Sequence, residues 1–274
     1  MVAPVVDEQW LAGREDVVLA DVRWYLDGRS GRAAYEAGHL PGAVFVDLER
    51  WLAGQSAATD GRHPLPEPSV LAEGMASLGI GEDDVVVAYD DAGGTVAARL
   101  VWLLRATGHE AALLDGGIGA WSGGLTTAAT ERPPAVFRPR PWPEDLLVDS
   151  DGVAAAVQAG HTVLLDARAG ERHRGEVEPV DPRAGHVPGA RSLPATTTLA
   201  PDGTVLPVDA LRERFAAAGV GPGTDVVASC GSGVTACHTL LLLEHAGLGT
   251  GRLYAGSFSA WSSDPSRPVA TGEG

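Results

Sequence analysis

Apolar and polar positions follow one another along this chain in blocks that predict alternating strands and helices. Short apolar runs end at Asp21 and Asp166, and a longer continuous run leads to Cys230. The segments 70–80 and 209–220 have the apolar spacing of amphipathic helices. Strands that are apolar throughout are buried on both faces, so the pattern predicts an α/β fold with mostly parallel sheets flanked by helices.

The same order of blocks occurs twice, which indicates two tandem domains of one fold. The matching stretches are LADVRW and LLDARA, AGHLPGA and AGHVPGA, VVAYDDAGGTVAARL and VVASCGSGVTACHTL, and LLDGGIGAW and LYAGSFSAW. Four matches in one order are hard to obtain by chance, and the last two pairs share an offset of 140 residues. We therefore expect a first domain over 1–130, a proline-rich linker over 131–145 and a second domain over 146–274.

Composition narrows the possible functions of these two domains. The 274-residue chain carries a formal net charge of -16 and contains no lysine. This excludes Schiff-base chemistry and argues against nucleic-acid or anionic-membrane partners. No apolar run is long enough to span a membrane, and the N-terminus lacks the pattern of an export signal. The scattered histidines and two cysteines predict neither a metal site nor a disulfide framework, and free thiols favour a cytoplasmic location.

Cys230 lies where the longest apolar strand of the second copy ends and a helix begins. The residues after it are Gly231, Ser232, Gly233, Val234 and Thr235. Glycines allow backbone N–H groups to turn inward and bind an anion, and a helix that begins near Thr235 adds the positive end of its dipole. The sulfur is therefore expected to be ionised near neutral pH and to attack an anionic substrate. In the first copy Asp90 takes this position, so we expect that copy to be non-catalytic.

The loop does not predict phosphoryl transfer. A phosphatase loop has five residues between the cysteine and an arginine that binds phosphate, whereas the sixth residue after Cys230 is Ala236. Cys237, on the apolar face of the following helix, is expected to be an ordinary buried residue.

Together, GHLPGA and GHVPGA, LLDGGIGAW and CGSGVTAC resemble the two-domain rhodanese sulfurtransferases, and the loop resembles their 3-mercaptopyruvate branch. The resemblance covers nearly the whole chain. It implies a ping-pong reaction in which Cys230 takes sulfur from a small anionic donor, 3-mercaptopyruvate, and becomes a persulfide. The sulfur then passes to cyanide or to a thiol acceptor such as thioredoxin, with no cofactor or metal.

The resemblance also implies roles for individual residues. Ser232 matches a serine that polarises the leaving group, together with a histidine at His63 and a carboxylate at Glu49 where the family has aspartate. Arg172 matches the first of two arginines that bind the substrate carboxylate. The second position falls on Val180, for which Arg183 or Arg174 is expected to substitute. The remaining loop positions, Gly231, Gly233, Val234 and Thr235, are expected to bind substrate through their backbone.

Two other functions stay open at this point. Thiosulfate is the alternative donor, although a neutral loop suits a doubly charged donor less well. The other alternative is a non-enzymatic rhodanese-like module that binds a partner or carries a persulfide. Asp21, Asp166, His39 and His186 recur in both copies, including the one without a nucleophile, so they are expected to be structural.

Overall fold

The computed structural model describes residues 1–57 and 59–273 and divides them into two compact units. The first unit comprises 1–54, 65–142 and 200–205, and the second comprises 55–64, 143–199 and 206–274. Each unit contains the sheet of one of the two sequence copies. The ten-residue segment 55–64 belongs with the second unit, although it lies within the first copy in sequence.

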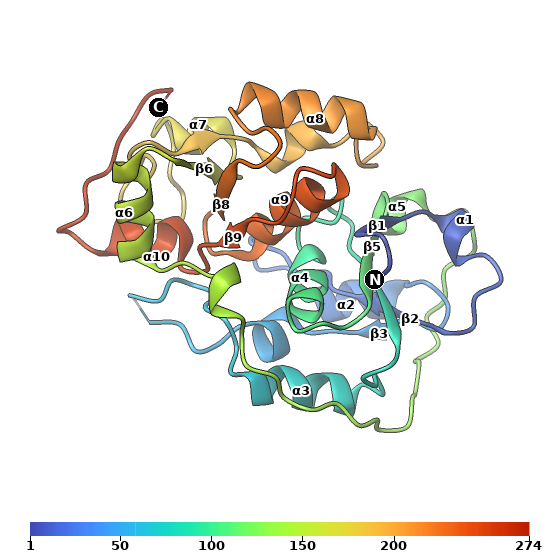
Figure 1. The fold of residues 1–274 in the computed structure, drawn as a ribbon. Coiled ribbons are helices and arrows are strands. Elements are labelled where there is room, and N and C mark those ends of the chain that lie inside the picture. Colours follow the sequence, from blue (N-terminus) through green and yellow to red (C-terminus); the bar gives the residue numbers. More distant parts are fainter. Residues whose placement is uncertain (58, 274) are drawn as a thin grey trace. The chain divides into compact units, whose positions relative to one another are not determined.

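The first unit has a five-stranded parallel sheet with the order β1-β5-β4-β2-β3. Figure 1 labels β1, β2, β3 and β5 of this sheet. Its strands are β1 (Val5–Val6), β2 (Val17–Asp21), β3 (Val44–Phe45), β4 (Val85–Tyr89) and β5 (Ala111–Leu114). Its helices are α1 (Glu8–Leu11), α2 (Gly31–Ala37), η1 (Leu48–Leu52), α3 (Pro68–Ser77), α4 (Ala98–Ala106) and α5 (Gly117–Ala120). One cluster of its core joins Leu40, Val87, Tyr89 and Ala112, all fully buried, so the apolar strands are covered as their sequence predicts.

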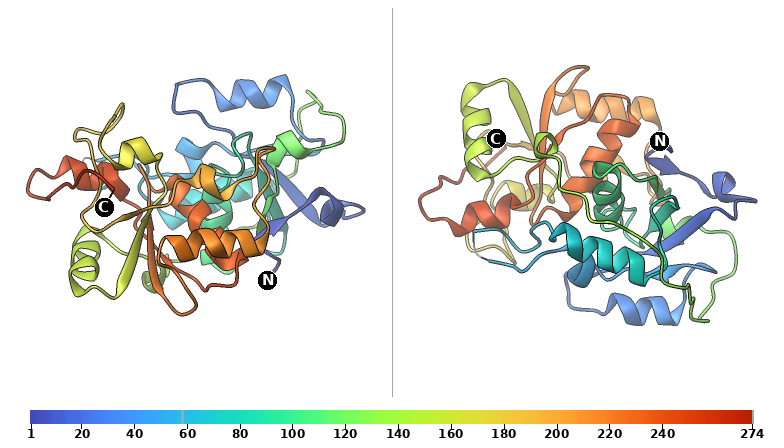
Figure 2. Two further views of the ribbon diagram at one scale, coloured as in Figure 1. Left: turned by 90° about the horizontal axis from the view of Figure 1, so that it is seen from above. Right: turned by 60° about the horizontal axis from the view of Figure 1, so that its bottom comes forward.

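The second unit has a four-stranded parallel sheet with the order β7-β6-β8-β9. Its strands are β6 (Thr162–Asp166), β7 (Arg191–Ser192), β8 (Asp225–Ser229) and β9 (Arg252–Leu253). Its helices are η2 (Glu144–Leu146), α6 (Ser150–Ala159), α7 (Gly170–His173), η3 (Ala195–Thr198), α8 (Val208–Ala217), α9 (Val234–His245) and α10 (Ser257–Ser263). In the left view of Figure 2, α6 and α10 lie on one side of these strands and α8 and α9 on the other.

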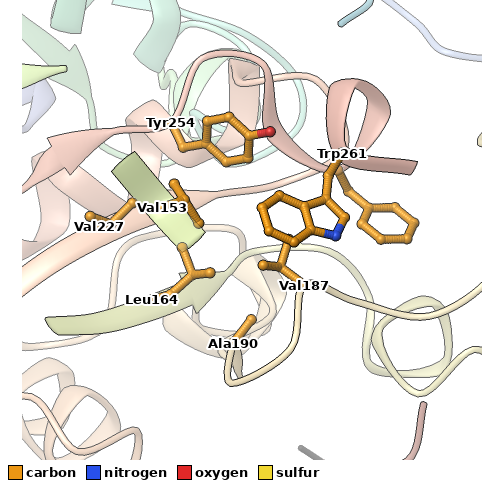
Figure 3. Close-up of a cluster of buried hydrophobic side chains, with 8 residues drawn as sticks. Val153, Leu164, Val187, Ala190, Val227, Tyr254 and Trp261 are labelled. Atoms are coloured by element: carbon orange, nitrogen blue, oxygen red, sulfur yellow. The ribbon is translucent and has the colours of Figure 1, made fainter. Parts of the chain in front are cut away.

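Apolar side chains from both α6 and α10 pack on one face of this second sheet. The cluster joins Val153 of α6, Leu164 of β6, Val227 of β8 and Trp261 of α10, each at most 3% exposed (Figure 3). Burying such side chains contributes about 1.5–3 kcal/mol each relative to leaving them in water. The cluster therefore fixes α10, and with it the turn that precedes α10, against the carboxyl ends of the strands.

The two Gly-His-x-Pro-Gly-Ala turns are anchored in the same way in both units. In the second unit Arg168 donates to the Asp166 carboxylate and, at 2.7 Å, to the carbonyl oxygen of Gly185. Burial raises the pKa of the Asp166 carboxyl, but hydrogen bonds from His173 and Arg168 bring it well below its ordinary value. His186 stacks on His173 at 3.8 Å between ring centroids, so these residues hold the turn. The first unit repeats the arrangement with Asp21, Arg23, Gly38, Tyr35 and His39.

No helix in the described part of the chain is long and apolar enough to cross a membrane.

Candidate active site

Cys230 is the first residue after β8, at the end of the sheet where ligands of parallel α/β folds bind. Its side chain is almost completely buried, with 3% exposure. The N–H group of Gly233 donates to Cys230 Sγ over 3.1 Å. Gly233 is the N-cap of α9 and has the left-handed backbone conformation (φ 81°) that glycine adopts without strain. The turn therefore directs a peptide N–H group and the start of a twelve-residue helix toward the sulfur.

The turn between β9 and α10 holds this loop from the other side. Ser257 Oγ accepts a hydrogen bond from the Cys230 N–H group at 3.0 Å and donates to the carbonyl oxygen of Tyr254 at 2.8 Å. The N–H group of Phe258 donates to the Cys230 carbonyl at 3.0 Å. Ser257 is fully buried and has a φ of 51°, a conformation that costs a non-glycine residue about 1–2 kcal/mol. Strain of this kind is typical of positions that are held for function.

The corresponding loop of the first unit shows where its N–H groups point. Asp90, which stands 140 positions before Cys230, is fully buried. Its carboxylate accepts four backbone hydrogen bonds, each of 2.8 Å, from Ala92, Gly94, Val96 and Ala97. Four donors that converge on one carboxylate define an anion site built from main chain. Burial raises the pKa of the Asp90 carboxyl, and the four N–H groups act against that shift. In the first copy the loop thus satisfies a buried carboxyl group with main-chain donors.

Ser232 and His63 form a buried polar pair beside Cys230. His63 Nδ1 lies 2.8 Å from Ser232 Oγ, and the two side chains are only 7% and 9% exposed. His63 reaches this position because the two residues before it contact the turn before α10 and α10 itself. The N–H group of Arg62 donates to Ser259 Oγ at 3.1 Å. At Gly61 (φ 85°) a methyl group would lie 2.5 Å from the Gly256 carbonyl oxygen. Both sequence-predicted partners are therefore brought together.

Two guanidinium groups lie next to Gly231. A methyl group on that glycine would be 2.8 Å from Arg62 Nη2 and 3.7 Å from Arg172 Nη1. The Asp181 carboxylate pairs with both arginines, with Arg62 through Oδ1 and with Arg172 at 3.1 Å through Oδ2. Burial raises the pKa of the Asp181 carboxyl, against the two guanidinium charges, which lower it. Arg172 also binds Glu178 through Nε and Nη2, at 3.2 and 2.6 Å.

A family model described as a rhodanese-like domain matches residues 8–123 and again residues 149–264. The chain belongs to the rhodanese family. The resemblance and the fold class that the sequence predicts are thereby confirmed.

Curated relatives match the chain over nearly its full length. It is 45% identical to "Probable 3-mercaptopyruvate sulfurtransferase" of Pseudomonas aeruginosa over 99% of both chains. It is 43% identical to "Putative thiosulfate sulfurtransferase SseB" of Mycobacterium tuberculosis, over 94% of this chain and 92% of that protein. The crystal structure of SseA from Escherichia coli, described as showing the "Rhodanese" fold of 3-mercaptopyruvate sulfotransferases, superimposes with a TM-score of 0.82 at 31% identity. That match covers 93% of this chain and 99% of SseA.

Two expected rhodanese site residues lie elsewhere. The Arg183 guanidinium donates to the carbonyl oxygens of Trp261, Ser262, Asp264 and Arg267, at and after the end of α10. These carbonyls take up its donors, so nothing in its contacts supports the expectation that it binds substrate, which stays a prediction. Arg174 likewise pairs with Glu176 at 2.8 Å, near the surface.

Glu49 belongs to the first unit, where its carboxylate accepts a hydrogen bond from Trp24 Nε1 at 3.1 Å. Its part in a triad with Ser232 and His63 stays a prediction. Val234 and Thr235 form the first turn of α9, directly after the loop.

Three residues of this rhodanese site are missed by sequence reasoning, namely Arg62, Asp181 and Ser257. A signal for Ser257 exists in the repeat, because the equivalent residue of the first copy is Gly117, whose φ is 56°. A serine where the other copy requires a left-handed glycine indicates a constrained position. Arg62 directly precedes His63, but nothing in its sequence spacing predicts that it reaches Gly231.

Proposed function

We propose that this rhodanese is a sulfurtransferase that moves sulfane sulfur from 3-mercaptopyruvate to an acceptor through a persulfide on Cys230. The observation that carries the proposal is the placement of the Cys230 sulfur. It lies at the carboxyl end of β8, accepts the Gly233 N–H group, and has the Ser232–His63 pair on the adjacent loop position. A nucleophile beside a hydrogen-bonded acid–base pair is the constellation that covalent catalysis requires.

In the first half-reaction the Cys230 thiolate attacks the sulfur of 3-mercaptopyruvate. An S–S bond forms as the C–S bond of the donor breaks, and the bonding electron pair moves to carbon. The carbon fragment leaves as the enolate of pyruvate, which takes up a proton to give pyruvate. Cys230 then carries one extra sulfur atom.

Ser232 and His63 act on the leaving group in this proposal. The charge that develops on the enolate oxygen needs a hydrogen-bond donor, and the Ser232 hydroxyl is held for this role by its 2.8 Å contact with His63 Nδ1. General acid assistance of this kind contributes about 10²- to 10⁴-fold to rate.

Loop N–H groups stabilise the charged sulfur in both half-reactions. The first unit supports this assignment, because the equivalent loop surrounds the Asp90 carboxylate with four N–H donors. In the second unit the Gly233 N–H group contacts the Cys230 sulfur and is available to the thiolate and to the persulfide. Fixed peptide dipoles of this kind need no reorganisation when charge moves onto the outer sulfur.

In the second half-reaction a thiolate or cyanide attacks the outer sulfur of the persulfide. The new bond forms to the acceptor, the S–S bond to Cys230 breaks, and the thiolate is restored. Thioredoxin, a small thiol and cyanide all have the required nucleophile. Because both cysteines are free thiols, we place the reaction in the reducing cytoplasm.

Thiosulfate is the second candidate donor, and the name of the mycobacterial relative favours it. The loop after Cys230 itself carries no charged side chain, although Arg62 and Arg172 lie beside Gly231. The Ser232–His63 pair favours a donor whose leaving group takes up a proton, as the enolate of pyruvate does. We therefore expect a higher kcat/KM with 3-mercaptopyruvate than with thiosulfate.

The test is incubation of the purified protein with each donor, followed by intact-mass and peptide mass spectrometry. Wild-type protein should gain one sulfur atom on Cys230, and Cys230→Ser should gain none. Steady-state rates with cyanide as acceptor then compare the donors. A reactive Cys230 thiol that never acquires sulfur would instead support a binding module, and a clear preference for thiosulfate would defeat the assignment of the donor.

A further inference from the structure

The two guanidinium groups beside Gly231 come from different parts of the second unit. Arg172 is in α7, whereas Arg62 is in the segment 55–64, more than a hundred residues earlier. Both approach the same side of the residue that follows Cys230, at 2.8 and 3.7 Å from a methyl group placed on Gly231. Positive charge is therefore concentrated next to the nucleophile, where an anionic donor has to bind.

Asp181 holds the two like charges together. One oxygen of its carboxylate pairs with Arg62 and the other with Arg172, and the side chain is only 1% exposed. The Asp181 N–H group donates to Glu178 at 3.0 Å, which fixes the backbone below the carboxylate. Without a buried anion between them, two guanidinium groups at this spacing would repel each other. Asp181 thus positions both cations without touching the sulfur.

Arg62 keeps hydrogen-bonding capacity after this pairing. A guanidinium carries five N–H donors in one plane. Among the described residues, Arg62 Nε is buried and has no hydrogen-bond partner. A buried, unsatisfied donor on a charged group costs several kcal/mol unless a ligand satisfies it. Arg183, by contrast, distributes its donors over four carbonyl oxygens and has no comparable role.

We infer that Arg62 is the second guanidinium that binds the carboxylate of the sulfur donor, and that Asp181 positions it beside Arg172. This rests on the proposed function in so far as the donor is a 2-oxo acid with a carboxylate. The family's second carboxylate-binding arginine falls on Val180 in this sequence. Arg62, from a different segment of the chain, therefore takes its role. Because Arg62 adjoins His63, one segment supplies both the carboxylate ligand and the acid–base partner of Ser232.

The first experiment separates carboxylate binding from sulfur transfer. Iodoacetate and iodoacetamide alkylate the same thiol and differ mainly in a negative carboxylate against a neutral amide. We expect Arg62→Met to lower the rate of Cys230 alkylation by iodoacetate roughly tenfold or more, as removal of a charged hydrogen bond implies. The iodoacetamide rate should stay within about twofold, because the thiol itself is unchanged. Arg174→Met, two residues after Arg172, is the matched control and should change neither rate.

The second experiment uses steady-state kinetics with 3-mercaptopyruvate. Arg62→Met should raise KM roughly ten- to a hundredfold and leave kcat less affected. Arg62→Lys should recover part of the loss, since it keeps the charge without the planar fork. Asp181→Asn should also raise KM, because the two arginines lose the anion that holds them. A structural role for Arg62 would instead lower the iodoacetate and iodoacetamide rates alike.

An unchanged ratio of iodoacetate to iodoacetamide rates in Arg62→Met would overturn the inference. This ratio does not depend on sulfur transfer. If wild-type protein forms no persulfide from 3-mercaptopyruvate, the proposed function fails while the alkylation ratio still decides whether Arg62 binds a carboxylate. If Arg62→Met folds poorly, the same ratio measured on Arg62→Lys gives the answer.

Discussion

Gly233→Ala tests the claim that backbone geometry at the start of α9 makes Cys230 reactive. Gly233 has a φ of 81°, and an added methyl group would lie 2.3 Å from the carbonyl oxygen of Ala255. Ordinary van der Waals contact begins near 3.4 Å, so these atoms must separate by about 1 Å. The neighbour is backbone and not a flexible side chain, so the loop itself has to move. That movement disturbs the Gly233 N–H contact with Cys230 Sγ.

The expected loss of stability has two parts. Placing alanine in the left-handed region costs about 1–2 kcal/mol. Forcing a methyl group into a filled site costs about 1–3 kcal/mol more. The free energy of unfolding of the second unit should therefore fall by about 2–5 kcal/mol, which lowers its melting temperature by about 10 °C. A displacement of about 1 Å at the nucleophile should also lower kcat/KM about 100-fold.

Gly160→Ala is the matched control for this change. Gly160 ends α6 in the same unit with a φ of 73°, and no heavy atom lies within 4 Å of the position of an added methyl group. It should lose only the conformational part, about 1–2 kcal/mol, and keep its activity. Urea unfolding followed by tryptophan fluorescence gives both stabilities, and persulfide formation gives the activity. If Gly233→Ala matches Gly160→Ala in stability and retains wild-type kcat/KM, the argument from loop geometry is wrong.

Three further predictions concern other parts of the molecule. Ser232→Ala and His63→Asn should each lower kcat/KM with 3-mercaptopyruvate about 100-fold. The rate at which iodoacetamide alkylates Cys230 should stay near the wild-type value. Equal losses in both assays would contradict a role of these residues in protonating the leaving group. Cys237→Ala should form the Cys230 persulfide at the wild-type rate, because the Cys237 thiol donates to the Gly233 carbonyl inside α9, and failure to form it would give Cys237 a direct part in the reaction. Burial lowers the pKa of both His109 and His186, so the unfolded state binds protons that the folded state does not. The free energy of unfolding should therefore fall as pH drops from about 7.5 to 5.5. Thermal melts of His186→Gln should show a shallower dependence of melting temperature on pH than wild type, and an unchanged dependence would exclude His186 as a cause of the pH effect.

The fold and the loop around Cys230 could be predicted because both depend on local sequence. Apolar strands, glycines with left-handed backbone and a repeated block order identify the sheet and the loop around Cys230 without knowledge of distant contacts. Ser232 is two residues from the cysteine, so its placement follows from the same loop. The family resemblance adds His63, which no periodicity could have connected with Ser232.

Of the two cations beside the loop, Arg172 follows from the family resemblance, whereas Arg62 could not be predicted because tertiary packing decides its position. Arg183 and Arg62 both lie in polar stretches of the sequence, where an arginine is usually exposed to solvent. They differ in their contacts. Gly61 packs against Gly256 and the Arg62 N–H group donates to Ser259, whereas the Arg183 side chain donates to a carbonyl near the end of α10. The spacing of arginines along the chain predicts neither set of contacts.

In the first rhodanese copy, the Asp90 carboxyl group occupies the loop as a covalently attached ligand. Since the carboxylate is part of the chain, its local concentration far exceeds that of any dissolved anion, and the four N–H groups around it are permanently occupied. A gene duplication that left two open loops would give two competing sites for the same donor. A carboxylate built into one loop fills its main-chain donors, and under the proposed function sulfur transfer then uses Cys230 alone.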